Sequence, residues 1–114
     1  PDLPPFFTDD DAFAAAIAAA GNAVGDPVWR LPFWAGYEAS LDSPVADMNN
    51  VSDGPFAGAI VAALFLRRFV KTAGRFAHFD IWGWRNAQKA LGPKGGEVQA
   101  ARAMFELLRA TPVT

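Results

Sequence analysis

An apolar segment in the middle of the chain is the strongest constraint on its fold. No charged residue occurs from Pro55 to Leu66, and the run ends only at Arg67 and Arg68. Pro55 suits the first turn of a helix, and a helix that is apolar on every side is normally buried on every side. The run is shorter than the roughly 20 residues that cross a bilayer. We therefore expect a buried central helix over 56–70.

The composition is unusually apolar for a chain of 114 residues, with 52% hydrophobic and 19% charged residues. A self-contained domain of this size carries more polar cover, so some faces are expected to meet other protein. The net charge of −2 provides no electrostatic attraction for nucleic acid or an anionic membrane, and neither is expected as a partner. No cysteine occurs, which excludes disulfides, zinc–thiolate sites and thiol nucleophiles and fits a cytoplasmic protein.

The remaining chain predicts helices that alternate with short extended segments. Thr8 is the expected N-cap of an alanine-rich helix that ends near Gly25. Its apolar stripe comprises Phe13, Ile17, Ala20 and Val24. We expect extended pieces at 28–31, 45–51 and 76–82, a helical stretch at 33–41, a loop at 84–96 and a last helix at 97–109. The stripe of that last helix comprises Val98, Ala101, Phe105 and Leu108.

His78 and Asp80 are the histidine and carboxylate that would share one face of a strand. Such a pair could belong to a metal site, or to a base and the acid that orients it in a new hydrolase. The more frequent role is a buried histidine held by a hydrogen bond, and the sequence offers no third ligand. From these residues alone we predict an α/β chain with no catalytic residue and no metal site.

Three short segments in fixed order carry a resemblance to a known family. They are Asp26–Pro32 (DPVWRLP), Val45–Val51 (VADMNNV) and His78–Gly83 (HFDIWG). With the helix between the last two, they resemble the C-terminal part of the leucyl (cytosol) aminopeptidases, from about Asp9 to Leu108. The resemblance implies that residues 1–114 are the C-terminal segment of an α/β catalytic domain with a mixed sheet and helices packed on both faces. The N-terminal domain and the metal-ligand segment would lie outside this chain.

The resemblance also implies an activity, the hydrolysis of the N-terminal residue from peptides with two divalent metal ions (Mn, Zn or Mg). The family's metal-binding carboxylates, catalytic lysine and Asn-Thr-Asp-Ala-Glu-Gly-Arg motif lie upstream, and no segment here matches them. We therefore expect a cytoplasmic, hexameric metalloaminopeptidase as the full-length protein. This chain alone should be inactive and bind no catalytic metal.

The resemblance assigns three residues to the walls of the substrate pocket. Val51 would lie beside the pocket for the residue that follows the scissile bond, and Trp82 and Arg85 would line the pocket for the N-terminal side chain. Leucine-specific members read Asp-Ile-Ala-Gly where this chain reads Asp80–Gly83 (DIWG). The indole of Trp82 should therefore reduce the acceptance of a leucine side chain in this pocket and favour small or acidic side chains. Alternatively, Trp82 turns outward against Trp84 and specificity is unchanged.

A second hypothesis assigns the chain a different kind of function. The chain could be a non-catalytic interaction module that retains the aminopeptidase scaffold. An upstream extension that carries the Asn-Thr-Asp-Ala-Glu-Gly-Arg motif would decide for the enzyme.

Overall fold

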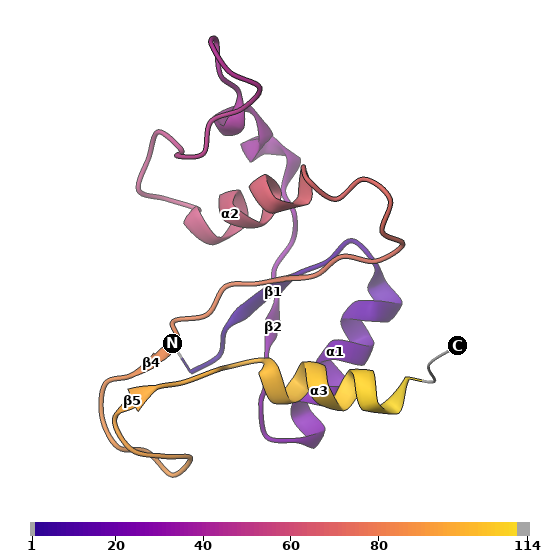
Figure 1. Ribbon diagram of the computed structural model, residues 1–114, viewed down its shortest axis with the longest axis vertical. Coiled ribbons are helices and arrows are strands. Elements are labelled where there is room, and N and C mark those ends of the chain that lie inside the picture. The colour runs from indigo at the N-terminus through magenta and orange to yellow at the C-terminus, as the bar shows by residue number, and fades with distance from the viewer. Residues whose placement is uncertain (1, 112–114) are drawn as a thin grey trace.

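The computed structural model describes residues 2–111, and its centre is a small mixed sheet (Figure 1). The strand order is β2 (Trp29–Arg30), β1 (Pro5–Phe7), β3 (His78–Phe79). β1 runs parallel to β2 and antiparallel to β3, which confirms the expected mixed sheet. The outer strands are shorter than the extended segments predicted at 28–31 and 76–82, because only two residues of each pair with β1.

One face of the sheet is covered by α1 (Asp11–Ala23) and α3 (Ala101–Ala110), which pack against each other (Figure 1). Phe6 of β1 is paired with Phe79 of β3, and their rings stack with centroids 5.7 Å apart. Ile17 of α1 is fully buried against this aromatic pair. A continuous apolar core therefore joins the sheet to both helices.

The other face of the sheet meets α2 (Gly58–Arg67). Side chains alternate along a strand, so Phe7 points away from Phe6. Its ring lies 5.7 Å from Phe33 and 6.0 Å from His78. Helices therefore cover both faces of the sheet, as the resemblance implied.

The first helix begins two residues later than predicted. Asp10, rather than Thr8, is the N-cap, because its Oδ1 accepts a hydrogen bond from Phe13 N at 2.8 Å. Thr8 Oγ1 instead accepts from Asp10 N at 3.3 Å and supports the cap. Ile17 and Ala20 are buried as predicted.

The central helix is shorter and less buried than predicted. Only Val61, Ala63 and Leu64 of α2 are buried, whereas Phe56 is 84% exposed and Phe69 is 60% exposed. The expectation of burial on every side is wrong for the described residues, because the sheet and the preceding 3-10 helix cover one side of α2 only. That 3-10 helix, η1 (Ala35–Leu41), is the helical stretch predicted at 33–41.

The last helix has a different inward face from the predicted stripe. Ala103 is fully buried, and Met104 and Leu107 pack against the core, whereas Phe105 and Leu108 are about two-thirds exposed. The helix also begins later than predicted, at Ala101, where the carboxylate of Asp26 accepts hydrogen bonds from its first backbone N–H groups. The predicted loop at 84–96 contains a hairpin of β4 (Trp84–Arg85) and β5 (Gly95–Gly96).

None of the helices in the described part of the chain has the length and apolar character that spanning a membrane requires.

Candidate functional site

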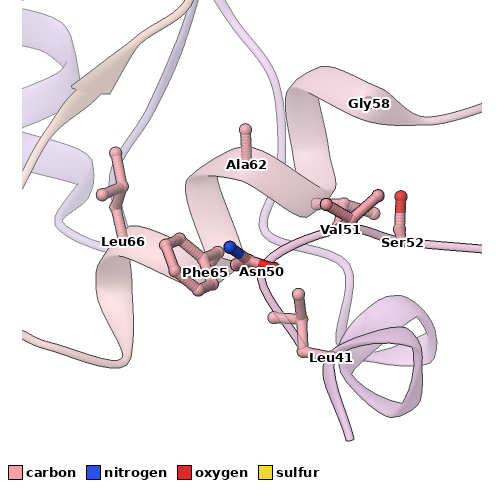
Figure 2. Close-up of a pocket in the computed structure, with 9 residues that line it drawn as sticks. Leu41, Asn50, Val51, Ser52, Gly58, Ala62, Phe65 and Leu66 are labelled. Atoms are coloured by element: carbon pink, nitrogen blue, oxygen red, sulfur yellow. The ribbon is translucent and has the colours of Figure 1, made fainter. Parts of the chain in front are cut away.

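A cavity of about 420 Å³ lies between the end of η1, the following loop and α2 (Figure 2). Its walls are mostly apolar with a few polar groups, which is typical of a ligand site. The lining residues are Leu41, Asn50, Val51, Ser52, Gly58, Val61, Ala62, Phe65 and Leu66. This cavity contains Val51, which the resemblance assigns to the substrate pocket.

Two arginines at the end of α2 hold η1 in place beside the cavity. Arg68 Nη2 donates to Glu38 Oε2 at 3.0 Å and to Glu38 O at 2.9 Å. Arg67 Nη2 donates to Glu38 Oε1 at 3.2 Å, and Arg67 Nη1 donates to Asp9 Oδ2 at 2.8 Å. The hydrogen bond to Glu38 raises the pKa of the Arg68 guanidinium. The partly buried ion pairs therefore stabilise one wall of the cavity.

The loop that carries Val51 is fastened at its base. Asn49 N donates to Leu41 O at 2.8 Å, and Asn49 Nδ2 donates to Asp42 O at 2.6 Å. Beyond this anchor, Val51 is 73% exposed at the edge of the cavity, and Val45 is 93% exposed. The prediction of a buried extended piece at 45–51 is therefore wrong: the segment forms bends, with no strand partner among the described residues.

Arg85 lies in a second cavity, of about 330 Å³, beside the β4–β5 hairpin. Its side chain is 9% exposed and forms an ion pair of 3.0 Å with Glu97. Arg85 Nη1 also donates to Pro93 O at 2.9 Å. A Cβ atom at Gly92 would lie 2.5 Å from that nitrogen, so the hairpin backbone passes directly against the guanidinium. Arg85 thus holds the hairpin together.

Trp82 follows β3, and its side chain is 61% exposed. It precedes Gly83, whose φ of +72° belongs to a turn that favours glycine. Val51 and Arg85 line different cavities, so the described residues do not unite the three predicted pocket residues in one cavity.

His78 is half-buried, and its ring packs near Phe7. Burial lowers the pKa of His78, and the negative charge of Asp80 opposes that shift. Within residues 2–111, no group of three or more histidine and acidic side chains is placed to hold a metal ion. The described residues therefore do not form a ligand set that fits the metal ions implied by the resemblance.

Asp26 is a buried residue with a structural role that the sequence did not indicate. It is 4% exposed and its carboxylate accepts hydrogen bonds from Ala100 N, Arg102 N and Ala103 N. Its place within the Asp26–Pro32 segment was the available signal, but the groups it binds lie far along the chain.

The model of the cytosol aminopeptidase family, catalytic domain, matches residues 2–105. This chain belongs to the cytosol aminopeptidase family.

Similar proteins extend well beyond the matched region. A probable cytosol aminopeptidase of Nitratidesulfovibrio vulgaris is 49% identical over 105 residues, which are 90% of this chain and 20% of that protein. The crystal structure of the cytosol aminopeptidase from Coxiella burnetii matches with a TM-score of 0.86 and 43% identity, over 96% of this chain and 24% of that one. The bottromycin maturation enzyme BotP in complex with Mn matches with a TM-score of 0.85 and 35% identity, over 96% of this chain and 24% of that one. The chain thus spans about a fifth to a quarter of the length of these relatives.

Proposed function

We propose that this chain is part of a two-metal aminopeptidase that removes the N-terminal residue from peptides. The observation that carries the proposal is the family match over residues 2–105, in which Val51 lines a largely apolar cavity. Because the chain spans a fraction of its relatives' length, the metal ligands would come from residues outside it. The complex of BotP with Mn supports manganese as one of the divalent metals.

Each predicted pocket residue has a distinct part in this proposal. Val51, exposed at the edge of its cavity, would contact the residue that follows the scissile bond. Trp82, with an exposed indole, would narrow the pocket for the N-terminal side chain. Arg85 is held by Glu97 and Pro93, so it would shape that pocket by positioning the hairpin.

The whole enzyme would be cytoplasmic and a homo-oligomer, a hexamer by resemblance. The names of the curated relatives, which are probable cytosol aminopeptidases, support the cytoplasmic location. The exposed apolar side chains support the homo-oligomer, since they offer surface for contact with other subunits.

A non-catalytic interaction module is the competing function. The lack of a metal-holding group within residues 2–111 and the exposed apolar surface both agree with it. An upstream Asn-Thr-Asp-Ala-Glu-Gly-Arg motif in the same gene would exclude this reading.

The test is an assay of the complete gene product with alanyl, leucyl and glutamyl substrates, beside the 114-residue chain alone. The proposal expects hydrolysis by the complete product, weak acceptance of leucine, and no hydrolysis by the chain alone. A clear preference for leucine would overturn the role given to Trp82. Activity of the chain alone would overturn the prediction that the metal ligands lie outside this chain.

A further inference from the structure

The positive charge of Arg85 is compensated inside the fold. Arg85 Nη2 lies 3.0 Å from Glu97 Oε1, and both side chains are largely buried. Arg85 Nη1 donates to Pro93 O at 2.9 Å, so both terminal nitrogens of the guanidinium already have an acceptor. The third nitrogen, Nε, is buried and has no hydrogen-bond partner among the described residues, so a ligand in the cavity does not reach it. Arg85 therefore presents a neutral ion pair to its cavity rather than a net positive charge.

The ion pair is fixed next to the segment that carries Trp82. Glu97 N donates to O of Gly83, the residue after Trp82, at 3.0 Å. In the hairpin, Arg85 of β4 is paired with Gly95 of β5, which brings the two partners of the ion pair onto neighbouring strands. Glu97 therefore belongs to the same local structure as Trp82 and Arg85, the residues that the proposed function assigns to the pocket for the N-terminal side chain.

The other charges of the cavity beside Arg85 are balanced in the same way. Lys89 pairs with Asp2, and Arg102 Nη2 lies 3.7 Å from Asp26 Oδ1. Each cation among the described lining residues thus has an acidic partner that also lines the cavity. A further carboxylate would find no unpaired cation there, and a carboxylate that is taken out of water without a partner is unfavourable. The charged lining residues are Asp2, Asp26, Arg85, Lys89, Glu97 and Arg102.

We infer that Glu97 is a specificity-determining residue, which makes the pocket for the N-terminal side chain reject carboxylates. An arginine alone at this pocket would attract aspartyl and glutamyl side chains, because opposite charges interact strongly at short range in a partly buried site. The Glu97 carboxylate cancels that attraction and repels a second carboxylate. The substrates are therefore peptides that begin with a small uncharged residue, and not those that begin with an acidic one. This inference rests on the proposed function, which places Arg85 at that pocket.

The test compares glutamyl with glutaminyl substrates, because these two side chains have nearly the same size and differ in charge. It uses the complete gene product, its Glu97→Gln variant, and the double variant that combines Glu97→Gln with Arg85→Met. Glu97→Gln keeps an oxygen that can accept from Arg85 but removes the negative charge. Glu106→Gln is the control, because Glu106 also pairs with an arginine, Arg109 at 2.7 Å, and lines neither of the two cavities.

The wild-type product should have a higher kcat/KM for the glutaminyl than for the glutamyl substrate. Glu97→Gln should raise the ratio of glutamyl to glutaminyl kcat/KM by about tenfold or more, because Arg85 then carries an uncompensated charge. The gain should arise mainly from a lower KM for the glutamyl substrate, and the double variant should lose it. A purely structural effect of Glu97 would change both substrates alike and leave the ratio unchanged.

Three results would overturn the inference. A wild-type preference for the glutamyl substrate would do so without any variant, and therefore even if Glu97→Gln did not fold. An unchanged ratio in Glu97→Gln, or an equal change in Glu106→Gln, would do so while hydrolysis of alanyl and glutaminyl substrates left the proposed function intact. A complete gene product that hydrolyses none of these substrates would overturn the proposed function, and this inference with it.

Discussion

The carboxylate of Asp26 accepts a hydrogen bond from the backbone N–H of Ala103 at 3.1 Å, although 77 positions separate the two residues. The same carboxylate accepts from Ala100 N at 3.1 Å and Arg102 N at 3.0 Å. Asp26 therefore caps α3 from the loop after α1, and Gly21 allows the close approach because a Cβ there would lie 2.6 Å from Asp26 O. This contact fastens the last helix to the rest of the fold.

Replacing Asp26 by alanine should destabilise the chain strongly. The change leaves buried N–H groups of α3 without an acceptor, and we expect the free energy of unfolding to fall by about 2–3 kcal/mol. Chemical denaturation followed by circular dichroism measures the change. Asp11→Ala is the control, because Asp11 pairs with Arg30 at the surface and its side chain is 91% exposed. That variant should lose about 0.5 kcal/mol or less, and equal losses in the two variants would contradict the capping role.

The chain's only histidine should make its stability depend on pH. Burial lowers the pKa of His78 below its usual value of 6.5, so the unfolded chain takes up a proton first as the pH falls. The free energy of unfolding is therefore unaffected by His78 above about pH 7 and decreases as the pH falls below 6.5. Denaturation at pH 7.5 and 5.5 should show this decrease, and His78→Gln should remove most of it. An unchanged pH dependence in the variant would contradict the burial of His78.

The specificity role of Trp82 can be tested by truncation in the complete gene product. If the indole narrows the pocket, Trp82→Ala should raise kcat/KM for leucyl relative to alanyl substrates by roughly tenfold. Trp84→Ala is the matched control, because Trp84 is also about half exposed and lies in the neighbouring strand. The same ratio in wild type and Trp82→Ala would favour the alternative in which the indole does not reach the pocket.

The isolated chain should not bind the catalytic metal ions. Within residues 2–111 no group of three or more candidate ligands is assembled, and a metal ion held by fewer protein groups is weakly bound. Titration of the chain with Mn²⁺ in a calorimeter should show no saturable binding in the micromolar range. Tight binding at a defined stoichiometry would contradict the proposal that the ligands come from outside the chain.

The sequence was sufficient to predict the elements that depend on local pattern. Ile17 and Ala20 lie at helical spacing and are buried in α1, and Phe79 lies in a strand that packs into the core. The resemblance supplied the mixed sheet and the family, neither of which composition alone could identify.

What the sequence did not reveal depends on contacts between distant residues. α3 begins where Asp26 caps it and packs Ala103, Met104 and Leu107 inward, so the pattern of Val98, Ala101, Phe105 and Leu108 indicated the wrong face. The exposed side of α2 was not predicted from its apolar sequence, because the helix was expected to be buried on every side and the sheet and η1 cover only one. At the candidate site, the resemblance assigned Val51 to the substrate pocket, which stays a prediction, and the structure places it at the edge of a cavity. The ion pair between Arg85 and Glu97 had no local signal in the sequence.

The central claim is that this chain is part of an aminopeptidase, and the most direct measurement is made on the complete gene product. Its mass should be compared with 12.2 kDa for this chain, and its release of N-terminal residues from peptides should be assayed. The account predicts a product about four to five times heavier, as in the relatives, that hydrolyses the first peptide bond. A product of the same mass as this chain that releases no N-terminal residue would contradict it.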